Sequence, residues 1–151
     1  MRSARILSLA HALCCVIGCG QPAAKPLPPN AERLDTARAA AYRVEKDDVR
    51  VAEKNRPNQD DRTVIAVQRR PLSRVQLRAV ARELAGSAKT PNVELYANDS
   101  AREACGRNRY RALRGETDPA DSQLCFDGTV LRMEQAEPWV IYWGAAAPAE
   151  R

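Results

Sequence analysis

Hydrophobic positions along the chain change their spacing several times, and each spacing predicts a different element. The β-branched run Thr63–Val67 predicts a strand, and Val93–Ala97 has the same character. Near the C-terminus, Thr129–Met133 and Trp139–Trp143 are separated by five mostly polar residues and predict a β-hairpin. A first strand, interrupted in its middle, is expected over residues 42–51.

One amphipathic helix is predicted over residues 73–85. Ser73 is a candidate N-cap, and Gln76 lies three residues later, where a capping box places its second partner. Apolar residues follow at the i, i+3, i+4, i+7 spacing of one helix face: Leu77, Val80, Ala81 and Leu84. Gly86 then provides a plausible end for the helix.

The segment between the third strand and the hairpin has weaker patterns. We expect a short helical turn over Asp99–Cys105, a further strand over Arg109–Leu113 and a polar loop over Glu116–Gln123. The order of elements predicts an α+β fold: a small antiparallel or mixed sheet, with the helix of residues 73–85 packed on one face and a β-hairpin at the C-terminus.

The N-terminus has the three zones of a secretory signal. Met1–Arg5 carries two positive charges, and Ile6–Ile17 is apolar apart from Ser8 and His11. The apolar run is too short for a membrane span, which needs about 20 residues. A buried N-terminal helix of the folded domain is the alternative, but the run has no amphipathic period.

The end of this segment resembles the lipobox of bacterial lipoproteins. Val16-Ile17-Gly18-Cys19 presents two aliphatic residues, a small residue and a cysteine, with Val where Leu is commoner. The resemblance implies that residues 1–18 are removed and that Cys19 carries lipid, so the protein is held on the membrane. Gly20, rather than Asp, implies the outer membrane in bacteria that have two membranes. Two or three acyl chains are enough for stable anchoring.

Composition changes between residues 19–41 and the rest of the chain. Four prolines between Pro22 and Pro29 favour extended backbone, so residues 19–41 are expected to be a flexible tether. One α+β domain is expected over 42–144, followed by a disordered tail over 145–151.

The cysteines and the single histidine restrict the chemistry. Cys14 and Cys15 leave with the signal, and Cys105 and Cys125 remain as a pair that predicts a disulfide in an oxidising compartment. Two separate buried thiols are the alternative. His11 lies in the signal, which excludes Ser-His-Asp and Cys-His mechanisms and a His-ligated zinc site in the mature chain. We expect no metal, no cofactor and no catalytic residue.

Net charge does not indicate nucleic-acid binding. It is +5 for the whole chain, and removal of Arg2 and Arg5 with the signal lowers it to +3. Arg107, Arg109 and Arg111 would share one face of a strand and could bind an anionic envelope polymer. The alternative is a solvated face whose charge is balanced by acidic residues close in sequence: Glu116, Asp118 and Asp121.

Two other groups of residues are candidate sites. Asp47-Asp48 and Asp60-Asp61 lie at expected turns, where solvated acids are more common than paired catalytic carboxyls. Trp139 and Trp143 are expected to face the core, although aromatic stacking on a ligand is the alternative.

The sequence thus predicts a lipid-anchored envelope protein whose domain binds an anionic polymer or another envelope protein without catalysis. An enzyme that uses Asp or Glu, and a structural subunit of an envelope complex, are the alternatives.

Overall fold

The computed structural model describes residues 26–54, 63–87, 92–136 and 138–150. Within them, six strands form one sheet in the order β1-β6-β5-β4-β3-β2. Neighbouring strands are antiparallel except β3 and β4, which are parallel. The strands are β1 (Ala31–Arg33), β2 (Val49–Lys54), β3 (Thr63–Gln68), β4 (Asn92–Tyr96), β5 (Thr129–Glu134) and β6 (Val140–Trp143).

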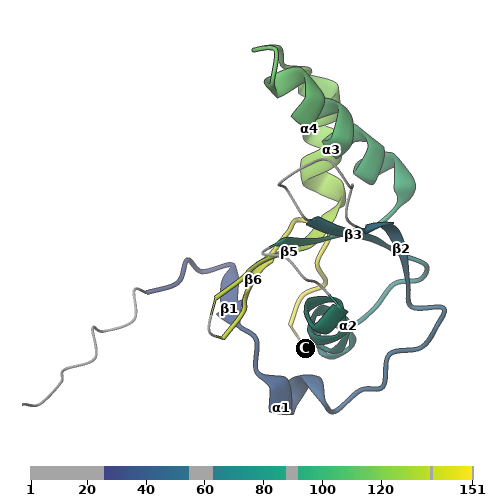
Figure 1. The fold of residues 1–151 in the computed structure, drawn as a ribbon, viewed down its shortest axis with the longest axis vertical. Helices are drawn as coiled ribbons and strands as arrows, with labels where there is room; N and C mark the ends of the chain where they lie inside the picture. Colours follow the sequence, from purple (N-terminus) through teal and green to yellow (C-terminus); the bar gives the residue numbers. More distant parts are fainter. Residues whose placement is uncertain (1–25, 55–62, 88–91, 137, 151) are drawn as a thin grey trace, which may run out of the picture.

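Helices lie on both sides of this sheet. They are α1 (Thr36–Ala39), α2 (Arg74–Ser87), α3 (Asp99–Ala112) and α4 (Pro119–Gly128). Figure 1 shows α1 and α2 on one side, while α3 and α4 project together from the other. The mixed sheet with helices confirms the α+β class, and β5 and β6 form the expected antiparallel hairpin.

Helix α2 supplies the main core, as its spacing predicts. Leu77 and Val80 are fully buried against Leu95, Leu131 and other side chains from the facing side of the sheet. The capping box is present at the start of the helix. The Ser73 amide donates to the Gln76 Oε1 at 2.9 Å, and the Gln76 amide donates to the Ser73 Oγ at 3.4 Å.

The predicted strand over Arg109–Leu113 and the loop over Glu116–Gln123 are wrong. Helix α3 continues from Asp99 to Ala112, and most of the expected loop belongs to α4. The physical reason lies in the local cap. The Asp118 carboxylate accepts from the amides of Ala120 and Asp121, and Pro119 occupies the first turn, where it has no amide to satisfy.

The fold also extends beyond the expected limits of 42–144. Strand β1 lies in the expected tether and pairs with β6, and Leu34 just after it is buried. At the other end, the Ala146 amide donates to the Thr129 carbonyl at 2.9 Å, so the tail joins the fold. The sequence did not predict β1, because Ala31-Glu32-Arg33 is too short and too polar to show the alternation of apolar and polar residues that marks a strand. The strand expected over residues 42–51 is β2, which begins at Val49.

Candidate functional site

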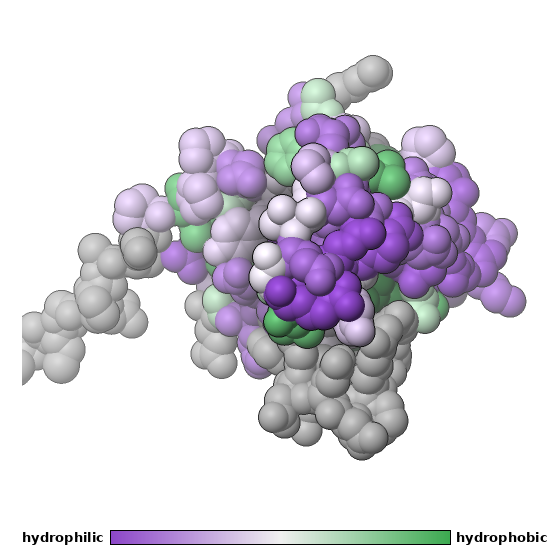
Figure 2. Space-filling model, turned by 90° about the horizontal axis from the view of Figure 1, so that it is seen from above, coloured by the Kyte–Doolittle hydropathy of each residue, from purple (hydrophilic) through white to green (hydrophobic). Residues whose placement is uncertain are grey.

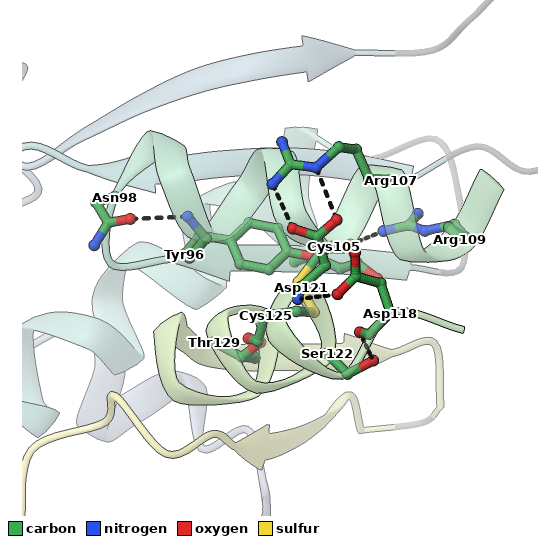
Figure 3. Close-up of a disulfide and its surroundings, with 12 residues drawn as sticks. Tyr96, Asn98, Cys105, Arg107, Arg109, Asp118, Asp121, Ser122, Cys125 and Thr129 are labelled. Carbon is green, nitrogen blue, oxygen red and sulfur yellow. Dashed lines mark hydrogen bonds and ion pairs between the residues drawn. A yellow bond between two sulfur atoms is a disulfide. The ribbon is translucent and has the colours of Figure 1, made fainter. Parts of the chain in front are cut away.

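Helices α3 and α4 form an antiparallel hairpin that a disulfide joins. Cys105 and Cys125 are bonded, with their Cα atoms 4.8 Å apart. This is the pairing that the cysteine count predicts. The disulfide lies beside the buried Tyr96 ring of the sheet, with Ala101 packed into the same cluster (Figure 3). The hairpin is therefore fixed at its base to one face of β4.

Two of the predicted anion-binding arginines are bound to carboxylates of α4. Arg107 holds Asp121 with two hydrogen bonds, of 2.9 and 2.6 Å, as Figure 3 shows. Arg111 donates to Asp118 at 2.6 Å and to Asp121 at 2.7 Å. The hydrogen bond from Arg107, together with the nearby Arg111 charge, lowers the pKa of the Asp121 carboxyl although burial opposes the shift.

The third arginine points to the sheet. Arg109 donates to the Glu94 carboxylate at 2.7 Å, and the same oxygen accepts from the Tyr96 hydroxyl at 2.6 Å. Arg107, Arg109 and Arg111 thus lie on a helix and do not form the common strand face that the sequence predicts. Their contacts with Asp118 and Asp121 are those of the charge-balanced alternative.

Charge on the α3–α4 hairpin is balanced overall. Residues 99–128 contain five arginines and six acidic residues. Exposed apolar side chains on the hairpin are Tyr110, Leu113, Leu124 and Phe126. Figure 2 shows the molecule from this side as mainly hydrophilic, with the hydrophobic residues in separate spots. The hairpin presents neither a basic surface nor one continuous apolar patch.

A second polar cluster surrounds Asp48, which the sequence placed among solvated turn acids. Its side chain is 0% exposed. It accepts from the Tyr42 hydroxyl at 2.9 Å, the Glu45 amide at 2.8 Å and the Arg70 Nε at 2.8 Å. Burial alone would raise the pKa of this carboxyl, but these hydrogen bonds outweigh it, and the net pKa is lowered.

The adjacent acid behaves as the sequence predicts. Asp47 is exposed, and its partner is Arg69 at 3.6 Å. Asp60 and Asp61 lie outside the described residues, as do Cys19 and the whole expected signal. The burial of Asp48 could not be read from the sequence. Its partners Tyr42 and Arg70 lie 6 and 22 positions away, and this spacing does not indicate a contact.

A third cluster lies on the α2 side of the sheet, around Trp143. This indole is buried, and the Arg74 guanidinium lies 4.1 Å from the centre of its ring. The Arg78 guanidinium lies 5.8 Å from the same centre. Trp139 packs against the core as well. The tryptophans are thus core residues, as expected, but Trp143 also contacts two cations that the sequence did not associate with it.

Arg78 links this cluster to both ends of the described chain. It donates to the Glu32 carboxylate from Nε at 2.7 Å and from Nη2 at 3.0 Å. It also donates to Glu150. Arg74 donates from Nε to the Pro148 carbonyl at 2.7 Å. Sequence reasoning missed this site, because its six residues come from β1, α2, β6 and the tail: Glu32, Arg74, Arg78, Trp143, Pro148 and Glu150.

A groove of about 270 Å³ lies between α2 and β2. Glu45 and Glu83 both line it, together with Lys46. Both glutamates are exposed, so neither has the desolvated setting that a catalytic carboxyl pair requires. Within the described ranges, no group of three His, Cys, Asp or Glu side chains is placed to hold a metal ion. The helices of these ranges include none with the length and apolar content of a membrane span.

Comparison with protein families, curated proteins and solved structures finds no match for this chain.

Proposed function

We propose that this protein is a lipid-anchored component of the bacterial envelope, and that its α+β domain binds a partner without catalysing a reaction. The observation that carries the proposal is the order of the first 19 residues. A basic start and an apolar run lead directly to Val16-Ile17-Gly18-Cys19. In that setting Cys19 is the residue that receives lipid, and the membrane is the first partner.

The disulfide supports an exported location. Disulfides persist in oxidising compartments and are rare in the cytosol of most bacteria. The Cys105–Cys125 bond joins α3 to α4, and a reducing compartment would remove that support. Residues 19–27 precede the turn in which the Ala31 amide donates to the Pro28 carbonyl, and a segment of that length spans about 30 Å when fully extended. That length lets the domain contact partners away from the lipid surface.

A binding role without catalysis is supported by the ion pairs between buried carboxylates and arginines. Asp48 and Asp121 are each held by an arginine, and hydrogen bonds to each carboxylate lower its pKa, which favours the ionised form. A carboxyl group in acid–base catalysis must instead change its protonation state near the working pH. An arrangement of this kind favours rigidity over proton transfer.

The same ion pairs favour a protein or peptide partner over an anionic polymer. Arg107 and Arg111 already satisfy two aspartates, so a polyanion would have to compete with contacts of 2.6 to 2.9 Å. A protein surface can use the mixed charges and separate apolar side chains of the hairpin without breaking them.

Intact-mass measurement of the protein from bacterial membranes tests the anchor. We expect a mature form that begins at Cys19 and carries acyl chains. The Cys19→Ala variant should lack the lipid and leave the membrane fraction. Its matched control is the Cys14→Ala/Cys15→Ala double variant, which removes thiols from the same segment and should be lipidated normally. An unlipidated wild-type chain, or a Cys19→Ala variant processed like the wild type, would refute the proposal.

A further inference from the structure

The C-terminal tail folds back onto the cluster around Trp143. The Ala146 and Ala147 amides donate to the carbonyls of Thr129 and Gly144, at 2.9 and 3.1 Å. Beyond Ala147, two side chains of α2 hold the tail: Arg74 through the Pro148 carbonyl and Arg78 through the Glu150 carboxylate. The end of the tail is thus bound in the way that a peptide ligand is bound.

The contact with Glu150 is weakly held. Its side chain remains 64% exposed, and ion pairs that are open to water contribute little to stability. Arg78, in contrast, is 10% exposed and is fixed by its two hydrogen bonds to Glu32. The Arg78 side chain is therefore already fixed in position, whereas the Glu150 carboxylate can be replaced by another carboxylate.

The site contains a hydrogen-bond donor that the tail does not use. The indole Nε1 of Trp143 is buried and has no hydrogen-bond partner. An unsatisfied buried donor of this kind is uncommon in folded proteins and is destabilising. With the tail removed, two guanidinium groups and this indole would lie together, and Glu32 would be the one carboxylate left among the residues of the cluster.

We propose that Arg74, Arg78 and Trp143 form a binding site for acidic peptide segments, and that the C-terminal tail occupies this site in the unliganded protein. The tail defines the chemistry of the ligand. It offers a backbone carbonyl to one arginine and, two residues later, a carboxylate to the other. An extended peptide with the same two groups replaces both contacts, whereas a small inorganic anion replaces only one.

Competition between tail and ligand follows from their common contacts. A tethered segment acts at an effective concentration on the order of mM, so the tail weakens any competing ligand by roughly the ratio of this concentration to the dissociation constant of the tail itself. Displacement of the tail would therefore accompany binding. This inference rests on the proposed function only in taking the protein to be a binding module, and it does not depend on the lipid anchor.

The test uses a fluorescent peptide with the sequence of residues 144–151, titrated with the mature protein and followed by anisotropy. The wild type is compared with a variant that lacks residues 148–151 and with the full-length Glu150→Gln variant. We expect the shortened protein to bind the peptide at least tenfold more tightly than the wild type. The Glu150→Gln protein should bind it several-fold more tightly, and it provides the test if the shortened chain does not fold.

Two controls separate specific recognition from charge attraction. A peptide with Gln in place of Glu should bind the shortened protein several-fold more weakly. Arg74→Gln should weaken binding, while Arg114→Gln, the same change on the opposite side of the sheet, should not.

Equal binding by the wild-type, shortened and Glu150→Gln proteins would overturn the inference, as would equal binding of the two peptides. Such a result with normal lipid on Cys19 would leave the anchor intact. A wild-type chain that carries no lipid when isolated from bacterial membranes, but binds the peptide as expected, would refute the anchor and leave this inference standing.

Discussion

The Arg70 guanidinium donates from Nε to the Asp48 carboxylate at 2.8 Å, across 22 positions of sequence. The carboxylate is fully buried, while the arginine side chain is 45% exposed. The Asp48 carbonyl also accepts from the Arg69 amide at 2.9 Å. Main-chain and side-chain hydrogen bonds together attach the turn before β2 to the end of β3.

The Asp48→Asn variant should lower the free energy of unfolding by roughly 1–3 kcal/mol, because an amide nitrogen would face donors that now meet a carboxylate oxygen. Urea denaturation followed by circular dichroism measures the change. Asp47→Asn is the matched control. Its carboxylate is 84% exposed and 3.6 Å from its partner, so we expect a change within about 0.5 kcal/mol. Equal effects of the two substitutions would contradict the structure.

The stability that Asp48 contributes should depend on pH in a defined direction. Its folded-state pKa lies below the unfolded value of about 3.9, because the hydrogen bonds to its carboxylate outweigh the effect of burial. The folded state therefore binds fewer protons, and the contribution is present above the unfolded pKa and is lost as pH falls through the folded pKa. The stability difference between wild type and Asp48→Asn should be largest above about pH 5 and shrink on acidification. A constant difference down to pH 2 would show that ionisation plays no part.

Much of the fold could be predicted from the sequence, because β3, α2, β4 and the β5–β6 hairpin each have a regular apolar pattern. Helix α3 does not. Its buried positions are Ala101, Ala104 and Cys105, all small, and the rest of the helix is rich in arginine. It is held by a disulfide and by ion pairs with α4, contacts that leave no hydrophobic period in the sequence.

The start of α4 was predictable in principle. Asp118-Pro119 is an N-cap residue followed by a proline at the first helical position, a combination typical of helix starts. Its acidic composition indicated a loop instead. The Trp143 cluster could not be predicted in the same way, because Glu32, Arg78 and Glu150 meet only after the sheet has formed.

Loss of the disulfide should destabilise the protein by about 3 kcal/mol, since the bond closes a loop with a sequence separation of 20. Hydrogen exchange of the Cys105→Ser/Cys125→Ser variant should be fastest in α3 and α4, while α2 keeps most of its protection. A reducing agent should destabilise the wild type to a similar extent and leave the double variant unchanged. Uniform loss of protection across the sheet would argue against a locally anchored hairpin.

Two glycines of the hairpin should respond oppositely to alanine. A Cβ on Gly128 would overlap the Ala101 Cβ, so Gly128→Ala should destabilise by about 1–3 kcal/mol. Gly106 lies within α3 and has open space around it, so Gly106→Ala should stabilise by about 0.5–1 kcal/mol. Thermal unfolding of the two variants under the same conditions measures both effects, and a shift of the same sign in both would be inconsistent with this packing.

Retention on a heparin column should reveal how the arginines of α3 are occupied. We expect the wild type to elute at low salt, because Arg107 and Arg111 are neutralised by aspartates. The Asp118→Asn/Asp121→Asn variant frees both arginines and should elute at higher salt. Circular dichroism checks that this variant remains folded. Strong retention of the wild type, unchanged in the variant, would restore the anion-binding hypothesis.

The pairing of β1 with β6 also has a consequence for the order of folding. The first described strand pairs with the last one. During synthesis, which starts at the N-terminus, Ala31–Arg33 therefore has no partner strand until Val140–Trp143 has been made. Closing so long a loop is slow compared with forming the β3–α2–β4 unit, whose contacts are closer in sequence. Ala31–Arg33 should thus be the last strand to be fixed, so a nascent domain has a longer unpaired N-terminal segment than the finished one.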